Sequence, residues 1–179
     1  MIQVSPDGRL TFNGRTYQCA LGRAGVVDAV DKREGDGATP AGFYPIRSIW
    51  FRPDRVTLPP LHFPTHEITS ADGWCDDPAN PYYNHHVMLP FNASHEILWR
   101  EDHRYDIMVV LGHNDDPPVS SLGSCIFWHV AQPTEGRTNK EQNYAPTAGC
   151  VAMAADDLLT ILPQLPGSAV MDIHRAVIR

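Results

Sequence analysis

Short stretches that alternate hydrophobic and polar residues recur along the chain, and they predict strands more often than helices. Residues 9–19 are typical of a β-hairpin, because Asn13-Gly14 supplies the two positive-φ residues of a type I′ turn. Residues 43–46 predict one more short strand, and the alternation in residues 168–178 predicts a closing strand.

Two longer apolar runs, at residues 106–112 and 124–130, are typical of strands that are buried on both faces. Only residues 154–162 predict a helix, because their leucines and isoleucine fall on one side and Pro163 follows them. The pattern therefore predicts a mostly β fold with one or two short helices.

Two stretches of the chain are expected to form the walls of a binding site. Residues 52–86 hold many of the prolines and aromatic residues and are expected to form a long irregular excursion. Loops of that length inside a compact domain are usually functional, as lids or binding walls. The polar loop Gln132–Tyr144 is expected to form a second wall.

The length of 179 residues suits one domain, so we treat residues 1–179 as a single unit. Hydrophobic residues make up 42% of the chain and charged residues 20%, an ordinary globular balance. The 13 glycines and 16 prolines argue against a helical bundle or a coiled coil.

The formal net charge of −7 and the lack of any basic block argue against nucleic acid or an anionic membrane surface as a partner. No apolar run approaches the roughly 18 residues of a membrane span. The first residues show no basic segment followed by an apolar one, so no secretory signal peptide is visible. A cytoplasmic protein, a mature form and a shortened chain all fit this pattern.

Nine histidines raise the question of a metal site. Neither Thr65-His66-Glu67 nor Ser94-His95-Glu96 continues to the His-Glu-x-x-His spacing of zinc proteases. Five residues could in principle converge on a metal, but their spacings match no structural zinc site: His62, His66, Cys75, His85 and His86. No glycine-rich nucleotide motif is present either, so we expect no metal and no organic cofactor.

Four cysteines are widely spread and form no Cys-x-x-Cys pair, which favours buried free thiols over a disulfide framework: Cys19, Cys75, Cys125 and Cys150. Cys150 differs from the others because it directly follows a glycine at the start of a new element. His129 ends a predicted buried strand, and an imidazole beside a thiol is what nucleophilic catalysis needs. On spacing alone, two unrelated core residues 21 positions apart remain the better interpretation.

Two segments of the sequence favour the catalytic interpretation of Cys150 and His129 over that of two unrelated core residues. The run from Lys32 to Gly42 resembles the early strand and loop of the L,D-transpeptidase (YkuD-like) catalytic domain. His129, a long gap and then Thr147-Ala148-Gly149-Cys150 resemble that family's signature of His, a spacer and Ser/Thr-His-Gly-Cys. The resemblance extends over nearly the whole chain. It implies a β-sandwich with long active-site loops, Cys150 as the nucleophile and His129 as its base.

The chain departs from the family pattern at Ala148, where histidine is usual, and at Ala152, where asparagine or arginine is usual. It is more similar to a divergent branch with the motif Thr-x-Gly-Cys-Val-Ala. That branch is linked to crosslinks between L-alanine and meso-diaminopimelate. Typical members of the family and this divergent branch therefore differ in which stem-peptide residue acts as the acyl donor.

The resemblance implies a peptidoglycan L,D-transpeptidase that joins donor and acceptor stem peptides through a Cys150 thioester, with carbapenem-type compounds as inhibitors. It also implies a place in the cell envelope or periplasm. A carboxypeptidase or endopeptidase with the same dyad, and a wall-binding module without catalysis, are the alternatives.

The remaining candidate residues are predictions of role. Gly149 and Thr147 are expected to shape the oxyanion site through the backbone amides around the nucleophile. Hydrogen bonds to substrate are expected from Tyr83, His113 and Asn114. Four cations are candidate anchors for substrate carboxylates, although a solvated surface charge is the commoner role of each: Lys32, Arg33, Arg104 and Arg137.

Overall fold

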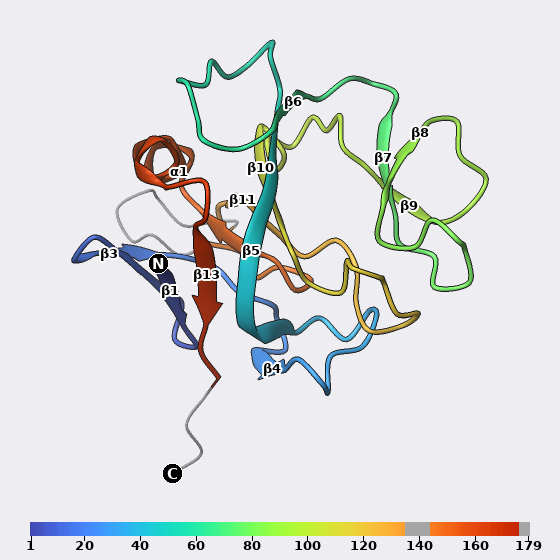
Figure 1. Cartoon of the computed structure of the whole chain (residues 1–179), viewed down its shortest axis with the longest axis horizontal. Helices are drawn as coiled ribbons and strands as arrows, with labels where there is room; N and C mark the ends of the chain where they lie inside the picture. The colour runs from blue at the N-terminus through green and yellow to red at the C-terminus, as the bar shows by residue number, and fades with distance from the viewer. Residues whose placement is uncertain (135–143, 176–179) are drawn as a thin grey trace.

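A computed structural model describes residues 1–134 and 144–175 of the protein. Strands dominate this part of the chain, and the single α-helix within it is short (Figure 1). The strands in chain order are β1 (Ile2–Ser5), β2 (Arg9–Phe12), β3 (Arg15–Gln18), β4 (Val26–Asp28), β5 (Thr39–Phe51), β6 (Thr65–Glu67), β7 (Asp72–Cys75), β8 (His86–Met88), β9 (His95–Ile97), β10 (Ile107–Leu111), β11 (Phe127–Val130), β12 (Val151–Met153) and β13 (Val170–Ile173). The helix α1 (Ala155–Ile161) continues into a 3₁₀ turn, Leu162–Gln164.

The long strand β5 organises the larger sheet, whose strand order is β12-β11-β10-β5-β13-β1-β2-β3. The first half of β5 pairs with β13 and its second half pairs with β10, so one strand belongs to both layers. After β3 the chain returns to β12, where Ala20 and Ala152 exchange backbone hydrogen bonds of 2.7 and 2.9 Å. This contact nearly closes the sheet on itself. The predicted mostly β, sandwich-like fold is confirmed.

The main hydrophobic core lies between these layers. It takes Ile2 and Val4 from β1, Trp128 from β11 and Leu158 from α1, all four of them fully buried. Burying such a side chain contributes about 1.5–3 kcal/mol relative to leaving it exposed. The helix lies against β11, so the core side of the strand that carries His129 is covered.

Several predicted elements are confirmed. Asn13 (φ 48°) and Gly14 (φ 74°) form the predicted turn between β2 and β3. Residues 106–112 contain the fully buried strand β10, and residues 154–162 contain α1. The closing strand is present as β13 but is shorter than residues 168–178.

Other boundaries differ from the prediction for local reasons. The strand predicted at 43–46 is part of the 13-residue β5, and Pro45 lies where β5 changes its partner from β13 to β10. The strand predicted at 124–130 begins only at Phe127, because Cys125 has a φ of +53°, which an extended strand cannot contain.

Residues 52–86 are mostly irregular, as expected, but the segment also contains short strands. It contains β6, and with β7 it begins a second, three-stranded sheet in the order β8-β7-β9. Trp74 of this sheet packs edge-on against Phe127 of β11, with 5.2 Å between the ring centroids. The second sheet therefore packs against the side of β11 that faces away from α1. Within the described residues, no helix has the length and apolar character needed to cross a membrane.

Candidate active site

Two parallel neighbouring strands, β11 and β12, place the predicted nucleophile and base. Trp128 pairs with Val151 and His129 with Ala152. Because paired residues point to the same face and the side alternates along a strand, Cys150 and His129 share one face. Both line a cavity of about 260 Å³. The structure thus brings together the two residues that the sequence singled out.

The Cys150 thiol is 8% exposed and is held by two backbone groups. The Phe127 N–H donates to its Sγ at 3.3 Å, and its S–H donates to the Cys125 carbonyl at 3.1 Å. Burial, with the negative charge of Glu96 as a second cause, raises the pKa of Cys150 to about 12. The sulfur therefore rests as a thiol, and its attack requires a base.

The His129 imidazole is suited to act as that base. Its Nδ1 lies 2.9 Å from the Val130 carbonyl, which can only accept, so Nδ1 carries the proton and Nε2 keeps its lone pair. Burial, assisted by the positive charge of Arg104, lowers the pKa of His129 to about 4. Tyr105 packs edge-on against the ring at 5.5 Å. His129 is therefore neutral and fixed in orientation at physiological pH.

The turn before Cys150 is held by Thr147. Its Oγ1 donates to the Cys150 carbonyl at 2.7 Å and accepts from the Gly149 N–H at 3.1 Å. Gly149 has a φ of +151°, and a Cβ at this position would lie 2.9 Å from the Ala38 carbonyl oxygen. Only glycine fits here without movement of the backbone. The Gly149 amide is engaged by Thr147, and the oxyanion role of both residues stays a prediction.

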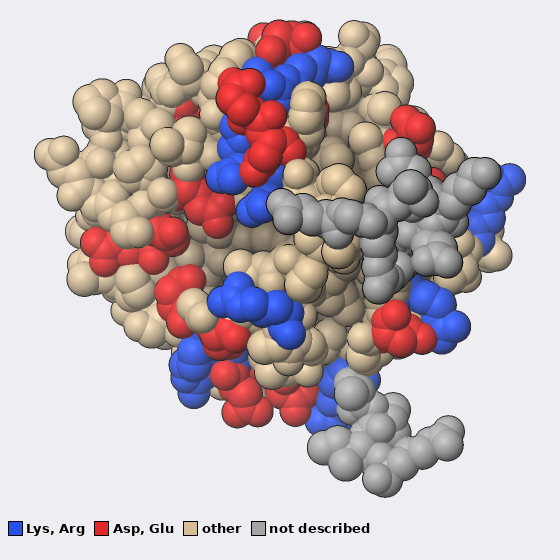
Figure 2. Space-filling model, turned by 180° about the vertical axis from the view of Figure 1, so that it is seen from behind, with Lys and Arg blue, Asp and Glu red and all other residues tan. Residues whose placement is uncertain are grey.

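Charged side chains surround the nucleophile. Arg23, Arg104 and Glu96 line the cavity of about 260 Å³. A smaller cavity of about 80 Å³ adjoins it and shares Arg23, Glu96 and Cys150. Seen from behind the view of Figure 1, Lys or Arg and Asp or Glu side chains are intermixed around a hollow near the middle of the surface (Figure 2).

Three further residues of the site were not predicted from the sequence: Arg23, Glu96 and Tyr105. Tyr105 donates a hydrogen bond to the Glu96 carboxylate, and burial raises the pKa of Glu96. Glu96 comes from β9, and its only sequence signal was the His-Glu pair considered for zinc. Its closeness to Cys150 depends on how the second sheet packs, which no local pattern reports.

Four of the residues predicted to contact substrate line neither cavity: Arg33, Tyr83, His113 and Asn114. The Arg33 guanidinium is exposed and donates to the Val30 and Lys32 carbonyls. The other three make hydrogen bonds within the protein: Tyr83 to Glu34, His113 with Leu122, and Asn114 to Val119 and Gly123. As substrate contacts, these four stay predictions.

Among the candidate anchors, the expectation of a solvated charge is wrong for Lys32. It is 2% exposed, and its Nζ lies 2.5 Å from Asp36 Oδ1, which compensates its charge. Arg104 lines the cavity beside His129, with 41% of its side chain exposed. Arg137 and most of the loop Gln132–Tyr144 lie outside the described residues.

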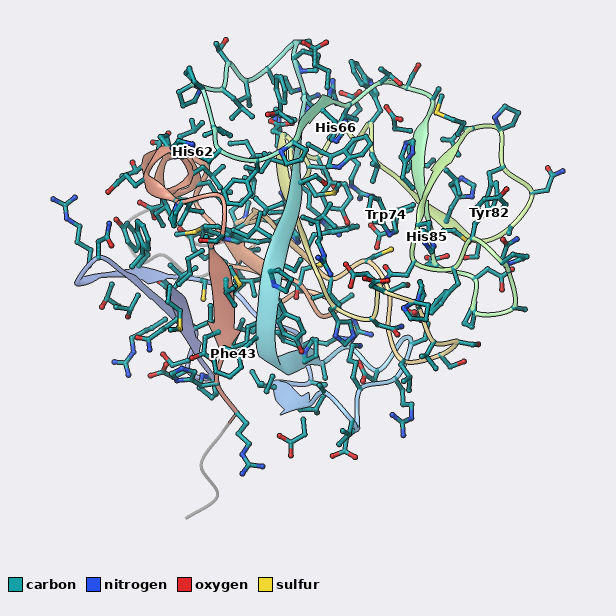
Figure 3. The ribbon with its side chains drawn as sticks, in the orientation of Figure 1. Phe43, His62, His66, Trp74, Tyr82 and His85 are labelled. Atoms are coloured by element: carbon teal, nitrogen blue, oxygen red, sulfur yellow. The ribbon has the colours of Figure 1, made fainter. Side chains whose placement is uncertain are left out.

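The remaining cysteines and histidines do not form a second centre in the part of the chain that the structure describes. Cys19, Cys75 and Cys125 are buried free thiols. His62, His66 and His85 lie well apart (Figure 3), and no described group of three or more His, Cys, Asp or Glu side chains is placed to hold a metal.

Residues 2–173 match the family model described as the L,D-transpeptidase catalytic domain, YkuD. Among solved structures, the chain is similar to the helical cell shape determining protein Pgp2 from Campylobacter jejuni, with 14% identity and a TM-score of 0.43. That alignment covers 99% of this chain and 48% of Pgp2, so the chain spans about half the length of that protein. A search of curated proteins found no match. Because the family model spans nearly the whole chain and contains the Cys150 and His129 cavity, the protein belongs to the YkuD family of L,D-transpeptidase catalytic domains.

Proposed function

We propose that the protein is a peptidoglycan L,D-transpeptidase that transfers an acyl group through a Cys150 thioester. The observation that carries this proposal is the shared cavity of Cys150 and His129, with the lone pair of His129 Nε2 left for the thiol proton. A buried thiol beside a neutral, oriented imidazole is the arrangement that general-base activation of cysteine requires.

In the first step, Nε2 of His129 takes the Cys150 proton as Sγ attacks a donor carbonyl that follows an L-configured centre. The C–N bond of the donor then breaks, and the amine leaves with the proton returned by His129. In the second step, an acceptor amine attacks the thioester, and the C–S bond breaks to give the new amide and the free thiol. No metal or organic cofactor takes part in these steps.

The charges around the cavity support a peptide substrate that carries carboxylates. Arg23 and Arg104 line the cavity and supply two guanidinium groups, which suit carboxylate recognition. Peptidoglycan stem peptides carry such carboxylates, and the substrate class of the family agrees with this. We place the protein in the cell envelope on the basis of that substrate.

For the donor, we favour L-alanine, which would give a 1–3 crosslink to meso-diaminopimelate. Ala148 and Ala152 both line the cavity of about 260 Å³ at the positions where typical family members carry larger polar side chains. Small side chains here change the shape of the donor site close to the nucleophile. This supports a donor that differs from that of typical members.

Incubation with disaccharide-tetrapeptide muropeptides, followed by mass spectrometry of the products, tests the proposal. We expect crosslinked dimers whose fragmentation shows the donor residue, and their complete loss in Cys150→Ala. Cys125→Ala is the matched control, because alanine keeps the backbone carbonyl to which Cys150 donates. Dimers from Cys150→Ala, or equal loss in both variants, would contradict the assignment of the nucleophile. A carbapenem should likewise acylate only proteins that retain Cys150.

Hydrolysis of the same stem peptides is the second candidate function. It is favoured by the exposure of Arg104, since water that reaches the cavity competes with an amine for the thioester. Shortened monomers without dimers would establish an L,D-carboxypeptidase or endopeptidase. Unchanged muropeptides and an unmodified thiol would instead leave a wall-binding module.

A further inference from the structure

The smaller cavity beside Cys150 differs in chemistry from the cavity that contains His129. The two share Arg23, Glu96, Ala148 and Cys150, but the smaller one adds the carboxylates of Glu34 and Asp76. The nucleophile therefore borders a space whose lining carries three carboxylates.

The positive charges in the lining of the smaller cavity do not balance its three carboxylates. Lys32 also lines the smaller cavity, but its Nζ forms a 2.5 Å ion pair with Asp36, which is not part of the lining. Arg23 lies over Gly37, where an added Cβ would come within 2.9 Å of the guanidinium carbon. Apart from the compensated lysine, the lining of the smaller cavity thus carries one guanidinium group and three carboxyl groups.

The three carboxylates differ in how many hydrogen-bond partners they have. Glu34 accepts hydrogen bonds from Tyr83 at 2.5 Å and Ser124 at 2.7 Å, and Glu96 accepts one from Tyr105. Asp76 Oδ1 is buried and has no hydrogen-bond partner among the described residues. A buried polar atom without a partner is unfavourable by about 1–3 kcal/mol, and more when charged, so an incoming donor would be stabilised here.

The size of the cavity limits what can enter. Its volume of about 80 Å³ is small beside the neighbouring 260 Å³. A water molecule occupies about 30 Å³ in the liquid, so the smaller cavity holds the end of an alkyl chain but not a sugar ring. A group that is compact, positively charged and rich in donors fits both the volume and the lining.

We propose that the smaller cavity binds the primary ammonium group of the acyl acceptor, with Asp76 and Glu96 as its charge partners. The proposal rests on the transpeptidase function proposed above and assigns the two substrates to different cavities. The donor, which carries carboxylates, occupies the cavity with Arg23 and Arg104, and the acceptor ammonium occupies the acidic one.

The chemistry balances with these partners. The acceptor ammonium first releases one proton to a cavity carboxylate and from there to water, which leaves a neutral amine beside the thioester. The amine nitrogen then attacks the carbonyl carbon, the N–C bond forms and the C–S bond breaks. The second nitrogen proton passes through His129 to Cys150 Sγ, so the products are an amide, a free thiol and one proton in solution.

Binding can be measured without turnover. An NMR titration of the Cys150→Ala protein with Nα-acetyl-lysine amide tests the ammonium site, and the uncharged Nα,Nε-diacetyl-lysine amide is the matched ligand. We expect the cationic ligand to bind more tightly, and Asp76→Asn in the same background to weaken it by about tenfold. Asp77→Asn is the matched control, since Asp77 lines neither cavity and an asparagine Oδ1 keeps its hydrogen bond from the Ala79 N–H. Equal affinities in the Asp76 and Asp77 variants would overturn the proposal.

A second measurement uses the active protein and compares aminolysis with hydrolysis of the acyl-enzyme. Asp76→Asn should raise the KM for Nα-acetyl-lysine amide, while the rate with methoxyamine, which is uncharged at neutral pH, stays unchanged. An unchanged KM for the cation in Asp76→Asn would overturn the acceptor site. If the parent protein forms no acyl-enzyme, the proposed function fails, and the binding titration still decides whether the cavity holds an ammonium.

Discussion

The two sides of the active site are built differently. The inner side is the pair of strands β11 and β12, in which every residue is buried. The outer wall, residues 72–104, contains the small sheet β8-β7-β9, and its strands β8 and β9 are half-exposed. The inner strands fix Cys150 and His129 through backbone pairing, whereas the outer wall contributes Asp76, Glu96 and Arg104 through side chains alone. We therefore expect changes on the inner side to abolish chemistry and changes in the outer wall to alter substrate use.

The substitution His129→Gln tests most directly whether the inner side carries the chemistry. Glutamine is similar in size but cannot take the thiol proton, so acylation should slow by about 10²- to 10⁴-fold. Stopped-flow measurement of carbapenem acylation gives the rate directly. An acylation rate within a few-fold of the parent protein would show that another group activates Cys150.

The pH dependence of stability tests the buried, neutral state of His129. Its pKa is about 4 in the folded protein, against about 6.5 in an unfolded chain, so the unfolded state binds the proton more tightly. The stability contributed by the neutral ring is complete above pH 6.5 and is lost as the pH falls through 4, by about 3 kcal/mol.

Urea unfolding of the parent protein and of His129→Gln between pH 7 and pH 4 isolates this contribution. The stability difference between the two should shrink by that amount as the pH falls. A difference that does not change with pH would mean that His129 is not held neutral by burial.

Gly149→Ala tests the backbone contact on the inner side. The new Cβ would lie 2.9 Å from the Ala38 carbonyl oxygen at a positive φ, and we expect a loss of about 2–3 kcal/mol of stability together with lower activity. Gly25→Ala is the control, because Gly25 has a φ of +82° but nothing within 4 Å of an added Cβ. Thermal unfolding should show a clearly smaller loss for Gly25→Ala, and equal losses would exclude the contact as the cause.

In the outer wall, Arg104→Gln should have the smallest effect. The side chain is 41% exposed, so its interaction with a substrate carboxylate is screened by water. We expect the donor KM to rise by less than about tenfold, with kcat changed little. A loss of kcat comparable to that of His129→Gln would place Arg104 among the groups that act on the reacting atoms.

The contrast between the inner side and the outer wall also explains which features can be predicted from the sequence. The turn at Asn13-Gly14, the buried strand β10 and the glycine before Cys150 depend on local chemistry, and each has a visible pattern. The strand that carries His129 is also visible as an apolar run, although it begins only at Phe127. These features allow a mostly β fold to be predicted from the sequence, whereas the pairing of Cys150 with His129 is implied only by the resemblance to the L,D-transpeptidase family.

The outer wall has no such pattern. Glu96 and Asp76 line a cavity with Cys150 only because β7 and β9 pair and pack against Phe127. The length of β5 likewise follows from its two successive partners. These are long-range or tertiary effects, which propensity and periodicity along the chain do not report.

The most direct test of the central claim is to locate the acyl group after reaction with a donor muropeptide. Intact-protein mass spectrometry, followed by peptide mapping of the quenched reaction, shows whether a thioester forms and on which residue. We predict one donor fragment attached to Cys150 in the parent protein and in Cys125→Ala, and none in Cys150→Ala. A fragment attached elsewhere, or crosslinked product formed while Cys150 stays unmodified, would contradict the account.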